Sequence, residues 1–143
     1  LLMLCATRDG SKNMENKLTK LIEEKGLQDR VNLMTDFLDD DVAVATLAKC
    51  DLLVFPYQNT KESASGAVRM GVAAGVPIAV SPIPIFEDIE GAIKLRGKKV
   101  EDIVATISMT SKDELDRCRD SMIKLRDSTQ WQNIAELIQE RLK

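Results

Sequence analysis

Histidine is absent from the 143 residues of this sequence. A Ser-His-Asp triad, a histidine general base and a histidine-ligated metal site are therefore excluded within the chain. Aromatic residues make up only 3% of the chain, too few for the stacking platforms that bind single-stranded nucleic acid. The net charge of -3 offers no general basic face either, so nucleic acid is not an expected partner.

Cysteines are also few, at positions 5, 50 and 118, and they lack the close pairing of zinc and redox sites. This number and spacing of cysteines predict reduced thiols in a cytoplasmic protein. No apolar run approaches the ~20 residues that span a bilayer, so no transmembrane segment is expected. The opening run Leu1 to Ala6 is too short for a signal peptide and lacks an initiating Met, which suggests a fragment of a larger protein.

What the sequence does contain is an alternation of short apolar segments and helical patterns, with 44% hydrophobic and 30% charged residues. Strands are predicted at 1–6, 30–34, 51–55, 77–80 and 92–95, and helices at 12–25, 40–49, 65–74 and 100–108. Two further amphipathic helices, 111–126 and 129–142, should pack on the sheet or reach a neighbouring domain. This alternation predicts a single α/β domain over 1–143, with a Rossmann-like, doubly wound parallel sheet and helices on both faces.

In doubly wound sheets, ligands bind where the carboxyl ends of strands lead into helices, which draws attention to the loop after strand 51–55. The helix that follows begins near Ser65 and is rich in small residues, so its first N–H groups can attract an anion such as a diphosphate. Gly66 gives a phosphate room to approach, and Ser63 and Ser65 can donate hydroxyl hydrogen bonds. Alternatively, Ser65 is only an N-cap, and the residues of the helix are small because the helix is buried.

A carboxylate, Glu62, lies just before this turn, where it suits the hydroxyl groups of a sugar beside a phosphate. The spacing from Glu62 to Gly75-Val76-Pro77 resembles the donor domain of the retaining GT-B glycosyltransferases of the family-four type. Cys50 to Pro56 resembles the family's "aD-x-x-v-x-P" strand, and Ile85 to Ile89 its "pE-x-i" turn.

Three further stretches carry the resemblance over nearly the whole chain. The opening strand Leu1 to Leu4 is followed by a loop at Arg8 to Gly10, as in the family. Gly26 to Leu33 resembles the "gl-x-drV-x-f" stretch, and Ser128 to Trp131 the "sW" opening of the last helix. The order and spacing of these motifs indicate the family more than any one of them does.

The resemblance implies transfer of a hexose from a nucleotide diphosphate sugar to an acceptor hydroxyl with retention, without metal or cofactor. It implies polysaccharide or lipopolysaccharide biosynthesis and a cytoplasmic location, either free or peripheral to the inner face of the membrane through another domain. Glu62 takes the catalytic position and orients the donor sugar, and an absent N-terminal domain binds the acceptor. The implied donor-binding residues are Ser63, Ser65, Gly66, Ala67, Val68, Arg69, Phe37 and Ile85.

Two departures from the family stand out. The family's second glutamate, which accepts hydrogen bonds from the donor ribose, corresponds to Met70, which cannot accept them. Arg69 or a neighbouring loop would have to take over. The family's first strand–helix unit, which supplies cations to the diphosphate, is also absent, and the resulting sheet edges predict strand exchange or a homodimer. A non-catalytic Rossmann-like interaction or scaffolding domain is therefore the alternative function.

Several residues have both structural and ligand-binding interpretations. Phe37 is either a base contact or part of the core. Ile85 and Phe86 either contact the nucleotide or form a lid. Glu87 and Asp88 either bind a hydroxyl or begin a helical turn.

The remaining candidates are interpreted as structural. The acidic run Asp39 to Asp41 is expected to begin a helix and not to bind calcium or magnesium. Trp131 is expected to anchor its helix by packing, and Met109 and Met122 to fill the core.

Overall fold

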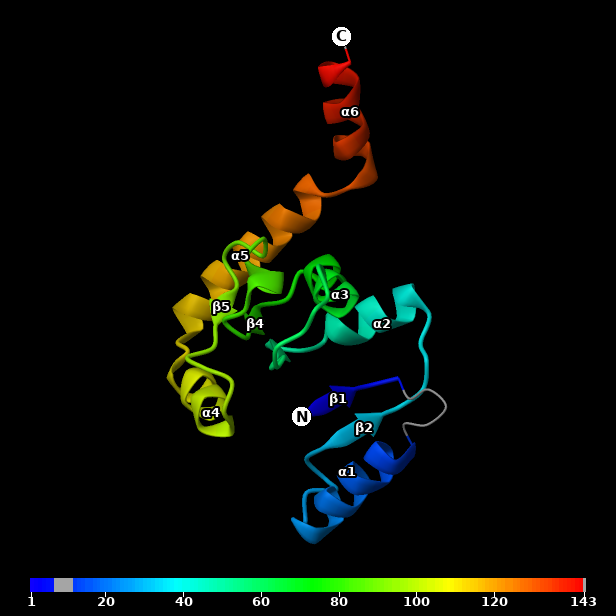
Figure 1. Ribbon diagram of the computed structural model, residues 1–143, viewed down its shortest axis with the longest axis vertical. Helices are drawn as coiled ribbons and strands as arrows, with labels where there is room; N and C mark the ends of the chain where they lie inside the picture. The colour runs from blue at the N-terminus through cyan, green and yellow to red at the C-terminus, as the bar shows by residue number, and fades with distance from the viewer. Residues whose placement is uncertain (7–11, 143) are drawn as a thin grey trace. The chain divides into compact units, whose positions relative to one another are not determined.

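The computed structural model describes residues 1–6 and 12–142, so that the loop expected at Arg8 to Gly10 lies outside the described residues. The chain divides into two compact units, Leu1–Asp39 and Asp40–Lys143. Figure 1 labels most of the helices and strands of both units.

The first unit is a strand, a helix and a second strand. The strands β1 (Leu2–Leu4) and β2 (Asn32–Met34) pair in parallel, with Leu2 opposite Asn32 and Leu4 opposite Met34. A parallel pair needs a crossover connection, which the helix α1 (Lys12–Glu24) provides. The hydroxyl of Thr35, just beyond β2, donates a hydrogen bond of 3.2 Å to the Glu15 carboxylate of α1.

The second unit contains a three-stranded parallel sheet in the order β3-β4-β5. These strands are β3 (Leu53–Phe55), β4 (Ile78–Val80) and β5 (Ile93–Lys94). The helix α2 (Asp40–Leu47) precedes β3, α3 (Gly66–Ala74) joins β3 to β4, and the 3-10 helix η1 (Pro84–Phe86) lies between β4 and β5. Three helices follow: α4 (Val100–Met109), α5 (Lys112–Ser128) and α6 (Trp131–Arg141).

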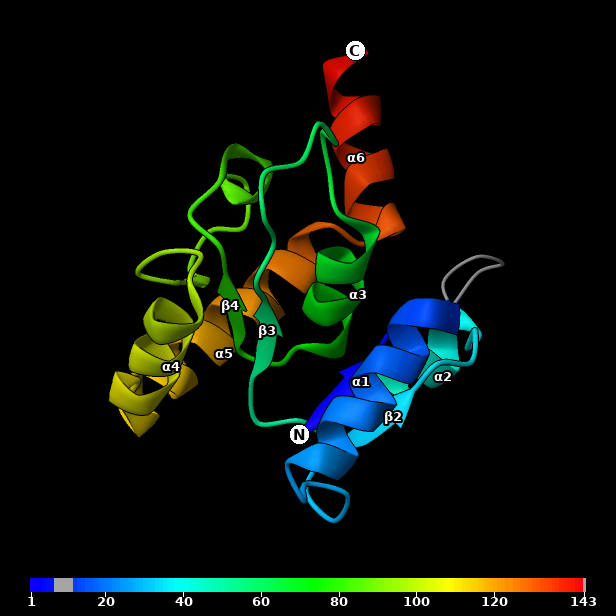
Figure 2. The same cartoon turned by 60° about the horizontal axis from the view of Figure 1, so that its bottom comes forward.

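The core of this unit is built on β4, whose three residues Ile78, Ala79 and Val80 are all fully buried. A continuous apolar run of this kind is typical of a strand covered on both faces. The helix α3 lies close to the sheet at Gly71, where a Cβ atom would come within 3.0 Å of the Leu53 side chain and 3.1 Å of that of Ile78. Figure 2 shows α3 beside β3 and β4. The small residues of α3 therefore serve close packing, as their sequence suggests.

The helix α5 packs against β4 and α3. Its Cys118 is buried, and the sulfur accepts a hydrogen bond of 3.3 Å from the backbone N–H of Ile78. Met122, one helical turn later, is fully buried, so the prediction that it fills the core is confirmed. All three cysteines are free, and Cys5 is exposed while Cys50 is half-buried.

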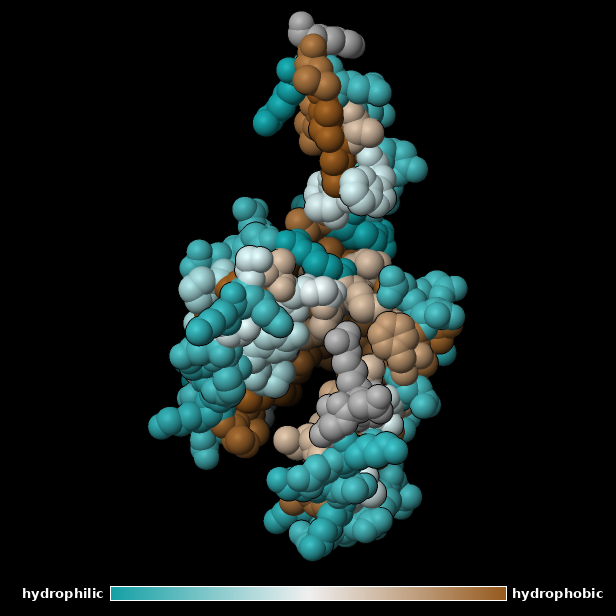
Figure 3. All heavy atoms as spheres, turned by 45° about the vertical axis from the view of Figure 1, so that its right-hand side comes forward, coloured by the Kyte–Doolittle hydropathy of each residue, from teal (hydrophilic) through white to brown (hydrophobic). Residues whose placement is uncertain are grey.

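The helix α6 leaves its apolar side chains uncovered. None of its residues is buried, Trp131 is 82% exposed and Leu142, at its C-terminal cap, is 81% exposed. Figure 3 shows the resulting brown stripe along this helix. The expectation that Trp131 anchors its helix by packing is therefore wrong, and so is the expectation that Met109 fills the core, because Met109 of α4 is 63% exposed. Both side chains lie on helix faces that nothing in the described chain covers.

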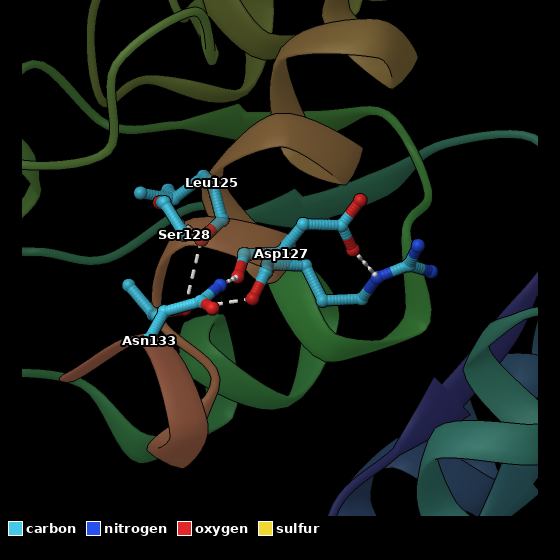
Figure 4. Close-up of polar contacts among 6 residues, drawn as sticks. Leu125, Asp127, Ser128 and Asn133 are labelled. Carbon is cyan, nitrogen blue, oxygen red and sulfur yellow. Dashed lines mark hydrogen bonds and ion pairs between the residues drawn. The ribbon is translucent and has the colours of Figure 1, made fainter. Parts of the chain in front are cut away.

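The turn between α5 and α6 is held by polar contacts. The side-chain amide of Asn133 donates to the carbonyl oxygen of Asp127, and the hydroxyl of Ser128 donates to the carbonyl oxygen of Leu125 at 2.9 Å. Figure 4 shows these bonds at the end of α5. They add to the backbone hydrogen bonds that the carbonyl groups of Leu125 and Asp127 accept from the N–H groups of Thr129 and Gln130.

The α/β class predicted from the sequence is confirmed, and every predicted strand and helix has a counterpart within a few residues. The five described strands lie in two small parallel sheets, β1–β2 and β3–β4–β5, whereas the sequence predicted one doubly wound sheet with free edges where its first strand–helix unit is missing. Within the described ranges, no helix has the length and apolar character needed to cross a membrane.

Candidate functional site

The polar groups singled out in the sequence gather at the carboxyl edge of the β3–β4–β5 sheet. Because these strands are parallel, the loop 56–65 after β3 and the loop 81–92 after β4 leave the sheet at the same edge. The first loop leads into α3 and the second contains η1. The candidate site is formed by these two loops and the first turn of α3.

Tyr57 links the two loops and the start of α3. Its ring lies edge-on to the ring of Phe86 at a centroid distance of 5.2 Å, and its hydroxyl is 3.0 Å from the Ser65 hydroxyl. Sequence reasoning did not select Tyr57. A signal was nevertheless available, because the chain's one tyrosine follows a predicted buried strand, and a buried tyrosine hydroxyl usually finds a polar partner.

Ser65 is the N-cap of α3, as its structural interpretation predicts. It has extended backbone angles, it is 7% exposed, and its hydroxyl oxygen accepts a hydrogen bond of 3.4 Å from the N–H of Val68. The N–H groups of Gly66 and Ala67 donate to no acceptor in the part of the chain that the structure describes. These two donors, at the positive end of the helix dipole, are available to an anion.

Gly66 faces open space. Beyond its chain neighbours and its own helix turn, a Cβ atom built on it would meet no heavy atom of the described residues within 4 Å, and the residue does not adopt the left-handed conformation that requires glycine. Neither folding nor packing in the described chain thus demands glycine here. The backbone at the start of α3 can be approached closely from outside.

Glu62 and Ser63 lie exposed in the loop before α3. The backbone N–H of Glu62 donates a hydrogen bond of 3.1 Å to the Thr60 hydroxyl, which shapes the loop. No hydrogen bond or ion pair to another described residue occupies the Glu62 carboxylate. Both side chains are free to meet a ligand at this edge.

Arg69, one turn into α3, forms an ion pair with Asp88 of the second loop. Lys94 of β5 donates a hydrogen bond of 2.8 Å to the carbonyl oxygen of Phe86 in the same loop. Partial burial lowers the pKa of Lys94, while the negative charges of Glu87 and Asp88 act in the opposite direction. The second loop is therefore fixed to α3 by Arg69 and to β5 by Lys94.

The first loop is also fixed at its outer end. The amine of Lys98, beyond β5, donates a hydrogen bond of 2.6 Å to the side-chain oxygen of Asn59. The side-chain amide of Gln58 donates to the carbonyl oxygen of Lys98 at 3.3 Å. Two loops joined to each other and to their neighbours make a preformed rim at the edge of the sheet.

The structure decides several alternatives that the sequence left open. Phe86 is fully buried, so it belongs to the core and is no lid, while Ile85 is half-buried against that core. Glu87 and Asp88 follow η1 and do not begin a helix. Phe37 belongs to the first unit and is 81% exposed, so the interpretation of Phe37 as a core residue is wrong.

The donor-binding residues implied by the resemblance thus fall into two groups. Those near the carboxyl edge of the second unit's sheet are Ser63, Ser65, Gly66, Ala67, Val68, Arg69 and Ile85. Phe37 is in the other unit. Val68 is 1% exposed, so its side chain belongs to the core and only its backbone N–H, already bonded to Ser65, points to the site.

The acidic run begins α2, as predicted from its position. Asp40 and Asp41 lie in the first turn, and the Asp41 carboxylate accepts a hydrogen bond of 2.9 Å from the N–H of Val42. Across residues 1–6 and 12–142, no group of acids and cysteines is arranged to hold a metal ion.

Comparison of the chain with models of protein families, with curated proteins and with solved structures gives no match. The chemistry of the site is therefore argued from its own groups. Two unpaired N–H donors at a helix start can hold an anion, and the carboxylates of the two neighbouring loops can accept hydrogen bonds from hydroxyl groups.

Proposed function

We propose that this chain is the donor-binding domain of a retaining GT-B glycosyltransferase of the family-four type. The enzyme transfers a hexose from a nucleotide diphosphate sugar to an acceptor hydroxyl, in polysaccharide or lipopolysaccharide biosynthesis in the cytoplasm. Its acceptor site lies in an N-terminal domain, which also provides any peripheral contact with the membrane. This domain alone is inactive.

The observation that carries the proposal is the start of α3. Two N–H groups without acceptors among the described residues, at Gly66 and Ala67, lie at the carboxyl edge of a parallel sheet, beside open space and after a carboxylate that no described residue occupies. An anion with attached hydroxyl groups fits this combination, since the N–H groups suit phosphate oxygens and Glu62 suits sugar hydroxyls. A diphosphate that carries a sugar has both features.

The strand order supports the doubly wound architecture with helices on both faces. In the commonest doubly wound sheet the first strand lies in the middle, with the second and third strands on one side and the fourth to sixth on the other. Removal of the first strand divides the rest into a parallel pair and a parallel triplet. The observed sheets, β1–β2 and β3–β4–β5, are such a pair and such a triplet. This grouping of the strands supports the proposed fold.

In this proposal the first turn of α3 stabilises the charge that develops on the leaving diphosphate, by electrostatics and without a general base or a metal. Glu62 orients the donor hexose through its hydroxyl groups. Ser65 holds the turn and Ile85 lines the rim beside it. Cations from the absent unit complete the diphosphate site, and the free strand edges make a homodimer of this chain possible in their absence.

Calorimetric binding of UDP-, GDP- and ADP-sugars to the intact protein tests the proposal. We expect saturable binding of one donor, weakened about tenfold or more by Glu62→Ala, because a hydrogen bond to a charged group is lost. Gly66→Ala should weaken the binding of the same donor and of its free nucleoside diphosphate alike, because its methyl group projects into the phosphate position.

Two controls accompany this experiment. Glu90→Gln, at an exposed acid of the second loop, should leave donor binding unchanged. Gly66→Ala should leave the melting temperature close to that of the wild type, since its Cβ would meet no described residue beyond its own helix turn and chain neighbours. A folded intact protein that binds none of the donors would overturn the proposal.

A non-catalytic interaction domain is the second candidate, and two observations favour it. Met70, half-buried on α3, provides no acceptor for a ribose hydroxyl. The exposed apolar stripe of α6 is of the kind that contacts another protein surface. A protein of this second kind would bind no donor, and substitutions in α6 would affect its assembly and not any transferase activity.

A further inference from the structure

The Arg69–Asp88 pair places a carboxylate beside α3 that the glycosyltransferase pattern does not include. Asp88 comes from the loop after β4, yet the Arg69 guanidinium holds it against the first turns of α3. Its side chain is 56% exposed, and only one of its two oxygens contacts Arg69. In the described chain no group donates to the other oxygen, which is free to accept from a ligand.

The loop that carries Asp88 is fixed at three points. Phe86 is buried against Tyr57, the Lys94 amine binds the carbonyl oxygen of Phe86 at 2.8 Å, and Arg69 holds Asp88 itself. Tyr57 in turn contacts the Ser65 hydroxyl at the N-cap of α3. The position of the Asp88 carboxylate relative to the start of α3 is therefore set by packing and hydrogen bonds before any ligand binds.

The charge of this pair determines which part of a ligand it suits. Asp88 neutralises the charge of Arg69, so a phosphate group at this position would be attracted only weakly by Arg69 and would be repelled by the carboxylate. Hydroxyl groups, in contrast, can donate to the free carboxylate oxygen. The anion belongs at Gly66 and Ala67, and a hydroxyl-bearing group belongs at Asp88.

Two carboxylates from different loops then accompany the start of α3. Glu62 precedes the helix in the loop after β3, while Asp88 comes from the loop after β4 and is held by Arg69 of the helix. A nucleotide diphosphate sugar carries two hydroxyl-rich rings, one at each end of its diphosphate. With the hexose at Glu62, the ring left for Asp88 is the ribose of the nucleoside.

We infer that Asp88 accepts hydrogen bonds from the vicinal hydroxyl groups of the donor ribose, and that Arg69 is its positioning residue. This inference rests on the proposed function. It gives the site a preference for ribonucleotides, and it assigns to the loop after β4 the hydroxyl contact that Met70 cannot make.

The test compares each nucleotide donor with its 2′,3′-dideoxyribose counterpart by calorimetry on the intact protein. Wild-type protein should bind the ribose form about tenfold or more tightly, because the dideoxy form leaves the Asp88 carboxylate without its donors. Asp88→Asn should bind the dideoxy form as the wild type does and lose the preference for ribose. Glu90→Gln, an exposed acid in the same loop, should retain the full preference.

The outcomes separate this inference from the proposed function. Donor binding by the wild type with no preference for ribose, or a preference that persists in Asp88→Asn, overturns the role of Asp88 and leaves the proposed function standing. Tighter binding of both forms by Asp88→Asn also overturns it, since Asp88 would then only compete for Arg69. If the wild type binds no donor, the proposed function fails and the inference fails with it.

Discussion

The two compact units are built from the same kind of element but bury very different amounts of apolar surface. In the second unit, the sheet, α3, η1 and α5 enclose a core that includes Phe86, Ile78 and Met122. In the first unit, none of the described residues is buried. A two-stranded sheet with one helix cannot enclose a side chain on all sides, whereas a third strand and a second helix can. Apolar patterning therefore produces a core only where enough layers meet.

The sharpest test of this comparison is the same substitution in both units. Phe86 is fully buried and Phe37 is 81% exposed. Phe86→Ala should lower the free energy of unfolding by about 3–5 kcal/mol, through lost burial and a cavity. Phe37→Ala should change it by less than about 0.5 kcal/mol. Urea unfolding of the full chain, followed by circular dichroism, measures both. Comparable losses would mean that the first unit contributes to a shared core.

A second pair of variants compares two glycines of positive φ. Gly91 has φ 78° and Gly26 has φ 63°, so alanine is strained at either position. A Cβ on Gly91 would overlap the Ser121 side chain of α5, whereas one on Gly26 would meet nothing within 4 Å. We expect a loss of about 2–4 kcal/mol for Gly91→Ala and of about 1 kcal/mol for Gly26→Ala. Thermal unfolding of both variants measures the difference, and equal losses would contradict the packing of α5 against this turn.

Two threonines make the same contact with the helix turn before them but differ in burial. Thr106 is 7% exposed, donates to the Asp102 carbonyl oxygen at 2.8 Å and accepts from the Arg96 N–H at 3.1 Å. Thr19 is exposed and donates to the Glu15 carbonyl oxygen at 3.0 Å.

Thr106→Val leaves the Arg96 N–H without its partner and should cost about 1–3 kcal/mol. Thr19→Val should cost less than about 0.5 kcal/mol. Urea midpoints of the two variants give the comparison. Equal changes in stability for the two variants would show that water replaces the Thr106 hydroxyl without loss of stability.

The smallest expected effect is the pH dependence that Lys94 confers on the second unit. Burial lowers its pKa below the value of 10.5 for a free lysine. In the interval between the two pKa values, the unfolded chain binds more protons than the folded chain, so the free energy of unfolding rises with pH. Compared with Lys94→Gln, the wild type should gain stability as the pH rises toward 10.5. The urea midpoints of the two proteins at several pH values test this direction. If the midpoints of both proteins change equally with pH, the prediction is refuted.

The local elements were predictable from the sequence because each depends on nearby residues. The apolar run 77–80 predicted β4, and Ser65 followed by small residues predicted the start of α3. The missing strand–helix unit indicated that the sheet would have free edges, but the sequence did not show which strands would pair, since pairing depends on which strand is available to each edge. The exposure of Trp131 could not be foreseen either, because amphipathic spacing shows which face is apolar and not what covers it.

The candidate site was predictable in part. Its location followed from the general rule for parallel sheets, and the N-cap role of Ser65 followed from its residue type. The contacts of Tyr57 with Ser65 and of Arg69 with Asp88 join residues that only the fold brings together. No local pattern encodes such contacts, although each involves a side chain whose polar group needs a partner.

The sulfur of Cys118, enclosed between α5 and the backbone of Ile78, turns the three cysteines into a graded set of chemical probes. A thiol reagent can reach Cys5 at once and Cys50 in part, but it can reach Cys118 only after α5 separates from β4. The rate at which the third thiol is modified therefore reports how often the core of the second unit opens. Labelling of the native chain accordingly follows the order of burial, with Cys5 first, Cys50 second and Cys118 last.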